Sequence, residues 1–139
     1  MTLLPVQMQK GFNHKLGIEL VEWTAQGMLG RLELTPDLLN SNGIAHGGIY
    51  CTLLDFGCGI AGSYAPPDAP RKFCVTLTLT TNFIASASSG MLHVRARRVG
   101  GGRKVFFAEA EITDDTGARL ATAVGTFRYI TPVSGPATD

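Results

Sequence analysis

One carboxylate stands alone in a long uncharged stretch of this sequence. Between Asp37 and Asp68 the only side chain with a formal charge is Asp55. From His46 onward its neighbours are mostly apolar or small, a pattern typical of a helix that is buried on every side. A carboxylate in such surroundings is costly unless it is paired or does chemistry, and functional sites often place acids there. The pattern therefore indicates a buried acid with a chemical role.

Glycines gather at the start of the same predicted helix, at Gly43, Gly47 and Gly48. The first N–H groups of a helix have no partner within it, and the positive end of the helix dipole lies there. A glycine also lets a carbonyl group approach the backbone closely. We therefore expect the Gly47 N–H to stabilise a developing oxyanion, while Asp55 deprotonates water or attacks directly. No G-x-S-x-G motif or Cys-His spacing competes with this pair.

The spacing along the helix indicates a site shared between subunits. His46 and Asp55 are nine residues apart in the sequence. At 100° and 1.5 Å per residue they would lie on opposite faces and about 13 Å apart along the axis. One chain could not then bring the Gly47 amide and Asp55 to the same carbonyl group. Two chains packed about a two-fold axis could, so we expect a homo-oligomer, either a dimer or a dimer of dimers.

The elements around this helix are expected to be strands in a single α+β domain over residues 1–139. A curled, antiparallel sheet would wrap around the one long central helix, because a helix buried on every side needs such a cover. We expect Thr76, Thr78 and Thr80 on one face of the strand that follows the helix. The expected segments are an arm at 1–14 anchored by Phe12, strands at 16–23, 28–35, 73–84, 90–99, 104–114 and 119–130, the helix at 46–63, and a flexible tail at 131–139.

Composition narrows the function classes further. The 139 residues carry a formal net charge of +1 without a strongly basic stripe, which argues against a nucleic-acid partner. The start of the chain lacks the long apolar segment of a secretory leader, and no uncharged run is apolar enough to span a membrane. The three cysteines, Cys51, Cys58 and Cys74, fit neither a disulfide framework nor a zinc site. We therefore expect a reduced, cytoplasmic protein without a metal.

The segment from 40 to 55 also carries a family motif. It reads N-x-x-G-x-x-H-G-G and, after six further residues, an acid; the motif positions are Asn40, Gly43, His46, Gly47, Gly48 and Asp55. This pattern resembles the hotdog-fold acyl-CoA thioesterases of the phenylacetate-degradation type. The predicted strand order and the G-T-F sequence at 125–127 fit that family as well, so the resemblance covers most of the chain.

The resemblance implies hydrolysis of an acyl-CoA thioester, aryl or medium-chain, to the free acid and coenzyme A, without a cofactor. It implies that Asp55 is the base or nucleophile and that the Gly47 amide is the oxyanion donor. It also implies that Asn40 and His46 orient water or the thioester. The family often has a Ser or Thr on the strand after the helix, and Thr76 is the matching residue here.

Substrate-binding residues are expected in two places. The acyl pocket should be lined by the helix and the linker after it, with Gly48 at the helix start and with Tyr50, Leu54, Phe56 and Tyr64. The phosphates of coenzyme A should meet the basic residues around the glycines at 100–102, chiefly Arg103 and Lys104. Alternatively, the basic residues of this region form cross-strand ion pairs with Glu109 and Glu111 or are simply solvated.

Each candidate has a structural interpretation beside the chemical one. Asp55 could be a buried acid that pairs locally, His46 could only satisfy backbone groups at the helix start, and Asn40 could be a turn residue. For the whole chain, the alternatives are a hotdog protein that binds acyl-CoA without hydrolysing it, a hotdog dehydratase or hydratase, and a structural oligomer with a vestigial site. The motif of the dehydratases, a His-Phe-Pro type of stretch, is missing.

Overall fold

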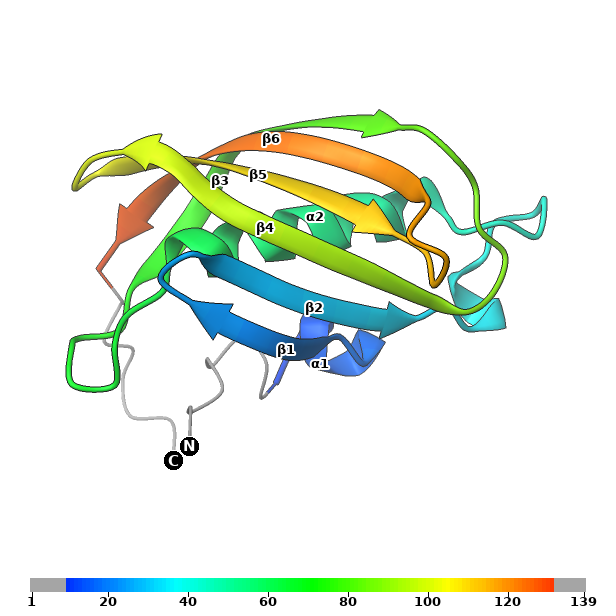
Figure 1. Cartoon of the computed structure of the whole chain (residues 1–139), viewed down its shortest axis with the longest axis horizontal. Helices are drawn as coiled ribbons and strands as arrows, with labels where there is room; N and C mark the ends of the chain where they lie inside the picture. Colours follow the sequence, from blue (N-terminus) through cyan, green and yellow to red (C-terminus); the bar gives the residue numbers. More distant parts are fainter. Residues whose placement is uncertain (1–9, 132–139) are drawn as a thin grey trace.

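A curled sheet around one long helix makes up the fold (Figure 1). The structure is a computed structural model and describes residues 10–131. Along the chain the elements are α1 (Phe12–Leu16), β1 (Glu19–Thr24), β2 (Gly27–Glu33), the 3-10 turn η2 (Pro36–Leu38), α2 (Gly47–Gly62), β3 (Phe73–Phe83), β4 (Met91–Gly101), β5 (Val105–Thr113) and β6 (Arg119–Ile130).

The six strands lie in the order β1-β2-β4-β5-β6-β3, and every neighbouring pair is antiparallel. Figure 1 shows α2 lying along the inner face of this sheet. Successive side chains of a strand point to opposite faces, so alternate residues form the core with the helix. On β5 these are Phe106, Ala108, Ala110 and Ile112, all buried. The predicted α+β hotdog fold, with its antiparallel sheet and central helix, is confirmed.

Glycines let α2 approach the sheet closely on the covered side. A Cβ built on Gly62 would lie only 1.9 Å from the Phe106 ring, and one on Gly57 would lie 2.9 Å from Val94. The Tyr129 hydroxyl donates a hydrogen bond to the Gly62 carbonyl at 2.6 Å. These contacts fix the C-terminal half of α2 against β4, β5 and β6.

Contrary to the sequence-based expectation, α2 is not buried on every side. The ten buried residues of the helix face the sheet, whereas a stripe along the helix keeps more exposure. Residues three or four apart are neighbours on a helix surface, and the stripe formed in this way contains Gly47, Gly48, Cys51, Thr52, Asp55 and Gly59. It exists because the two edge strands, β1 and β3, do not pair with each other around the helix.

The ends of the described chain also differ from expectation. Phe12 has 60% of its surface exposed, so it does not anchor the N-terminal segment. Leu16 closes α1, and the first strand begins only at Glu19, because Gly17 with φ of 79° ends the helix in a left-handed conformation. Most of the predicted arm and tail lie outside the described residues.

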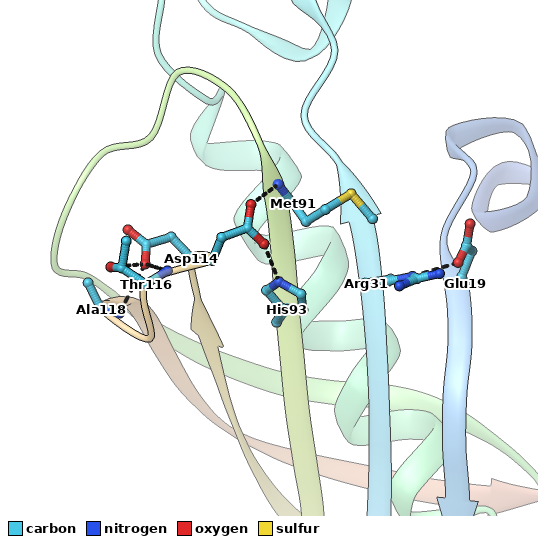
Figure 2. A network of polar contacts seen from close by, with 8 residues as sticks. Glu19, Arg31, Met91, His93, Asp114, Thr116 and Ala118 are labelled. Atoms are coloured by element: carbon cyan, nitrogen blue, oxygen red, sulfur yellow. Dashed lines mark hydrogen bonds and ion pairs between the residues drawn. The ribbon is translucent and has the colours of Figure 1, made fainter.

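A polar network holds the turn between β5 and β6 against the start of β4 (Figure 2). The Asp115 carboxylate accepts a hydrogen bond from the Met91 N–H at 3.2 Å and contacts His93 Nε2 at 2.7 Å. Asp114 Oδ1 accepts from the hydroxyl and the N–H of Thr116. The Thr116 hydroxyl bond is the largest cause that holds the pKa of Asp114 below its usual value. This network ties together the strand ends on the side of the sheet where α2 begins.

Candidate active site

The edge strand β3 runs beside the uncovered stripe of α2. Contacts follow in register along the two elements, from Phe83 with Gly47, through Thr81 with Cys51 and Thr76 with Asp55, to Cys74 with Gly59. The strand and the helix are therefore antiparallel at this edge. Both the helix start and the single acid of the stripe face the same strand, on the side of the sheet where it has no further neighbour.

Asp55 is half-buried rather than buried, because the uncovered stripe passes through it. Its Oδ1 accepts a hydrogen bond from the Thr76 hydroxyl at 2.6 Å. Among residues 10–131 no partner is found for its second oxygen, so that oxygen is available to water or to a ligand. The structure thus brings together two of the predicted catalytic residues, which come from different elements.

A β-bulge determines where Thr76 points. The register between β3 and β6 shifts between Thr76 and Thr78. Thr76 pairs with the buried Phe127, while Thr80 pairs with the exposed Val124 on the opposite face. The expectation that Thr76, Thr78 and Thr80 share one face was therefore wrong, since a bulge adds one residue and re-aims the side chains beyond it.

At the helix start, His46 and Gly47 have different roles. His46 is the N-cap of α2, and its Nδ1 accepts a hydrogen bond from the Gly48 N–H at 2.9 Å. The Gly48 amide is thereby occupied. No acceptor for the Gly47 N–H is found in the described part of the chain. Gly47 is thus left as the amide at the positive end of the helix dipole that can receive a carbonyl oxygen.

Asn40 shapes the turn before the helix. Its side-chain oxygen accepts hydrogen bonds from the N–H of Asn42 at 2.9 Å and of Ile44 at 3.3 Å. Gly43, which has φ of 75°, donates to the Asn40 carbonyl and completes this turn. The structure therefore gives Asn40 a turn role, and the turn delivers the chain to the Gly47 amide.

Gly47 and Asp55 lie along the same side of α2, which corrects the prediction of opposite faces. That prediction counted rotation from His46, but His46 is the extended N-cap, with ψ of 133°, and not a helical residue. The axial separation remains: eight residues of helix place Gly47 and Asp55 about 12 Å apart. Within one chain, a carbonyl group bound at the Gly47 amide is therefore out of reach of Asp55.

Most of the predicted acyl-pocket residues are buried in the core, and one packs against another aromatic ring. Leu54 has no exposed surface and Phe56 is 6% exposed, so both belong to the core under the sheet. Tyr50 is buried as well, and its hydroxyl donates to the Ala85 carbonyl at 3.1 Å. Burial raises the pKa of Tyr50, so its hydroxyl stays protonated. Tyr64 packs edge-on against Trp23.

Arg103 and Lys104 are exposed on the hairpin between β4 and β5, far from the helix start. The Lys104 carbonyl accepts from the Tyr129 N–H at 2.8 Å, and Tyr129 in turn contacts the last residue of α2, Gly62. Figure 1 shows this hairpin at the end of the sheet where α2 finishes. The structure does not bring these two cations to Gly47 within one chain.

The other part of the basic cluster follows the alternative interpretation. Arg97 forms an ion pair with Glu109 at 2.7 Å, across the β4–β5 pair, and Arg119 pairs with Glu111 at 3.1 Å. These pairs line a hollow of about 540 Å³ on the outer face of the sheet. None of the predicted catalytic residues lines this hollow. Its arginines and glutamates balance in number.

The thiols near the stripe are poor nucleophiles. Burial is the largest cause that raises the pKa of Cys58 to about 12, and Asp55 adds to it. Burial also raises the pKa of Cys74, against the hydrogen bond that the Ser63 hydroxyl donates to its sulfur. A thiol that stays protonated does not attack a carbonyl. Cys58 and Cys74 are therefore not nucleophiles here.

Residues 10–131 contain neither a metal site nor a membrane-spanning helix. No group of three or more His, Cys, Asp or Glu side chains is placed to hold a metal ion there. No helix in this part of the chain is both long and apolar enough to cross a membrane.

Residues 42–121 match the model of one protein family, the thioesterase superfamily. The chain belongs to this superfamily. A Mycobacterium tuberculosis H37Rv protein that is provisionally named an esterase is 29% identical over 113 residues, which is 81% of each chain. Its solved structure superposes with a TM-score of 0.78 and covers 86% of this chain and 96% of that chain.

Two other thioesterase-superfamily relatives are informative. The 1,4-dihydroxy-2-naphthoyl-CoA hydrolase of Listeria monocytogenes is 26% identical over 106 residues, covering 76% of this chain and 85% of its own. A phenylacetic acid degradation-related protein of Ralstonia eutropha JMP134 superposes with a TM-score of 0.74 at 27% identity. That superposition covers 90% of this chain and 92% of that chain. The family suggested by the motif is thus confirmed.

One residue beside the Gly47 amide could not be predicted from the sequence. Phe83, the last residue of β3, places its ring 3.3 Å from where a Gly47 Cβ would lie. No pattern in the sequence indicates this contact, since it joins residues that are 36 positions apart in the chain. An exposed aromatic residue at the end of a strand is not unusual by itself.

Asn40 offers a test of the turn role in this thioesterase-superfamily protein. Asn40→Asp keeps the accepting oxygen, so we expect its melting temperature to stay close to that of the wild type. Asn40→Ala removes it and should cost about 1 kcal/mol per lost hydrogen bond, seen in denaturant unfolding. Equal stability of the alanine variant and the wild type would contradict the turn role.

Proposed function

We propose that this chain is a thioesterase that hydrolyses acyl-CoA, aryl or medium-chain, to the free acid and coenzyme A. The observation that carries the proposal is the Thr76–Asp55 hydrogen bond on an uncovered helix stripe that begins at the free Gly47 amide. The name of the Listeria relative, a CoA-thioester hydrolase, supports the substrate class. Asp55 is the base or nucleophile in this proposal, and Thr76 holds it in position.

The reaction can follow either of two routes. In the general-base route, Asp55 takes a proton from water while the water oxygen attacks the carbonyl carbon. The carbonyl oxygen becomes an oxyanion that accepts from the Gly47 N–H. The C–S bond then breaks, and the coenzyme A thiolate takes the proton that Asp55 accepted from water, which restores the carboxylate. In the nucleophilic route the carboxylate attacks, and water hydrolyses the resulting anhydride.

The free edge of β3 supports a dimeric site. Within the described residues β3 pairs only with β6, so its other edge presents unpaired backbone groups over 11 residues. Val75 and Leu77 on this strand are 43% and 52% exposed. Long apolar edges of this kind are normally covered, because they otherwise pair with other chains. A second copy of the chain is the occupant that also completes the site.

The register of that dimer follows from the contacts within one chain. Gly47 lies beside Phe83, and Asp55 lies beside Thr76. If two β3 strands pair antiparallel about a two-fold axis near residues 79–80, Phe83 of one subunit comes opposite Thr76 of the partner subunit. Each Gly47 amide then approaches Asp55 of the partner subunit. Two identical half-sites would form two complete sites.

In this dimer the basic hairpin lies within reach of coenzyme A. Asp55 is seven residues from the end of α2, or about 10 Å along the axis. Arg103 and Lys104 extend beyond that end, and Lys72 lies nearby with its ammonium group 5.6 Å from the Tyr129 ring. The pantetheine arm of coenzyme A, when extended, is long enough to cover this distance. We therefore assign the phosphates to the hairpin of the subunit that supplies Asp55.

Replacing Asp55 tests the reaction directly. Asp55→Asn keeps the size of the side chain and its bond to Thr76, but it removes the base. We expect kcat to fall by a factor on the order of 10² or more. Thr76→Val should lower kcat by less, because the carboxylate remains. Thiol release from a panel of acyl-CoA esters is the measurement, and an Asn variant with the wild-type rate would refute the assignment.

The basic hairpin can be tested with matched substrates. The double variant Arg103→Ala/Lys104→Ala should raise KM for an acyl-CoA severalfold at low salt, while kcat stays nearly unchanged. KM for the same acyl group on N-acetylcysteamine, which has no phosphates, should not change. Lys15→Ala, on α1, removes an exposed cation elsewhere and serves as the control. An unchanged KM for acyl-CoA would show that Arg103 and Lys104 are solvated and do not bind the phosphates.

Mixing two inactive variants tests the shared site. Asp55→Ala and Gly47→Val should each be inactive alone. In a co-refolded mixture about half of the dimers combine both chains, and each of these contains one site with an intact Gly47 and an intact Asp55. Activity of about a quarter of the wild type should therefore return. Differentially tagged heterodimers that form and stay inactive would show that the site is assembled within one chain.

A further inference from the structure

The Phe83 side chain is unusual among the exposed apolar residues of β3. It is 59% exposed, yet its ring contacts the start of α2, 3.3 to 4.0 Å from the position of a Gly47 Cβ. Val75 and Leu77, which are also exposed, stand near the other end of the strand. An aromatic surface therefore lies open beside the one uncapped amide of the helix start.

The position of this ring is fixed by its neighbours. Phe83 stacks on Tyr50, with ring centroids 6.4 Å apart and planes 17° from parallel. Tyr50 is held in turn, because it is buried and its hydroxyl donates to the Ala85 carbonyl. Ala85 lies two residues after Phe83, so Tyr50 of α2 holds the end of β3 through both the ring and the backbone. A ring held in this way can bind a ligand with little further loss of side-chain freedom.

We propose that Phe83 is a specificity-determining residue for the acyl group of the substrate. The inference rests on the proposed thioesterase function and on Gly47 as the oxyanion donor. A carbonyl oxygen that accepts from the Gly47 N–H places the first carbons of the acyl group within contact of the Phe83 ring. One face of that ring is taken by Tyr50, and in the proposed dimer the remaining ring surface faces the shared site, where the acyl group would lie.

The chemistry of an aromatic surface defines what it selects. Flat, unsaturated groups gain stacking or edge-to-face contacts with it beyond the area that they bury, whereas a flexible alkyl chain gains mainly the area. Phe83 should therefore favour acyl groups that carry a planar ring close to the carbonyl over straight chains of similar size. This preference acts on binding and orientation at the carbonyl, and Phe83 takes no part in proton transfer.

The test compares two thioesters in the wild type and in variants of Phe83. Phenylacetyl-CoA and hexanoyl-CoA differ in the ring near the carbonyl but are similar in length. Phe83→Ala and Phe83→Leu should each lower the ratio of kcat/KM for the aryl over the alkyl ester by about fivefold, the size of one aromatic pair interaction. Phe107→Ala is the matched control, because Phe107 is 48% exposed and packs over Gly100, away from α2.

The outcomes separate this inference from the proposed function. An active wild type whose ratio stays within twofold in both Phe83 variants would overturn the specificity role and leave the thioesterase proposal intact. A change of the same size in Phe107→Ala would also overturn it. If the wild type hydrolyses no thioester, the proposed function fails and the inference fails with it. Should Phe83→Ala not fold, Phe83→Leu, which keeps most of the volume, decides the question.

Discussion

The sheet of this protein does not close around its helix, and the remaining features of the site follow from that gap. The six strands end at β1 on one edge and β3 on the other, and these edges do not pair with each other. The covered faces of α2 carry large residues such as Leu53 and Leu54, which have no exposed surface. The uncovered stripe carries Gly48, Thr52 and Asp55 instead. A carboxylate is tolerated there because water still reaches it and the Thr76 hydroxyl donates to it.

Much of this arrangement could be predicted from the sequence, because the relevant patterns are local. The strands alternate with a period of two, the glycine turns separate them, and prolines end the helix. The uncovered stripe could not be predicted, since Gly, Cys and Thr fit a buried face and an open edge equally well. The number of strands that face α2 decides which of its sides stays open, and that is a property of the whole sheet.

For the site residues, too, the sequence predicts which residues matter but not what their individual atoms contact. The motif supplied His46 and Asn40, but the same side chains can bind a substrate or satisfy the backbone. Their atoms are engaged with Gly48 and with the turn at 42–44. Thr76 was identified by its place in a family pattern, whereas the reason that it reaches Asp55 is a bulge that regular alternation cannot reveal. The role of Phe83 depends on its contact with Gly47, which lies far from it in the sequence.

In the proposed dimer, the separation of Gly47 from Asp55 along one helix becomes an advantage. A carboxylate in the first turn would be stabilised in its charged form by the helix dipole, and this would make it a weaker base. The dipole effect falls off within a turn, so an acid two turns along escapes it. The partner helix then supplies a positive end at the place where the oxyanion forms. Each helix thus gives its Gly47 amide to one site and its Asp55 to the other. The positive end of a helix then does not weaken the Asp55 of the same helix as a base.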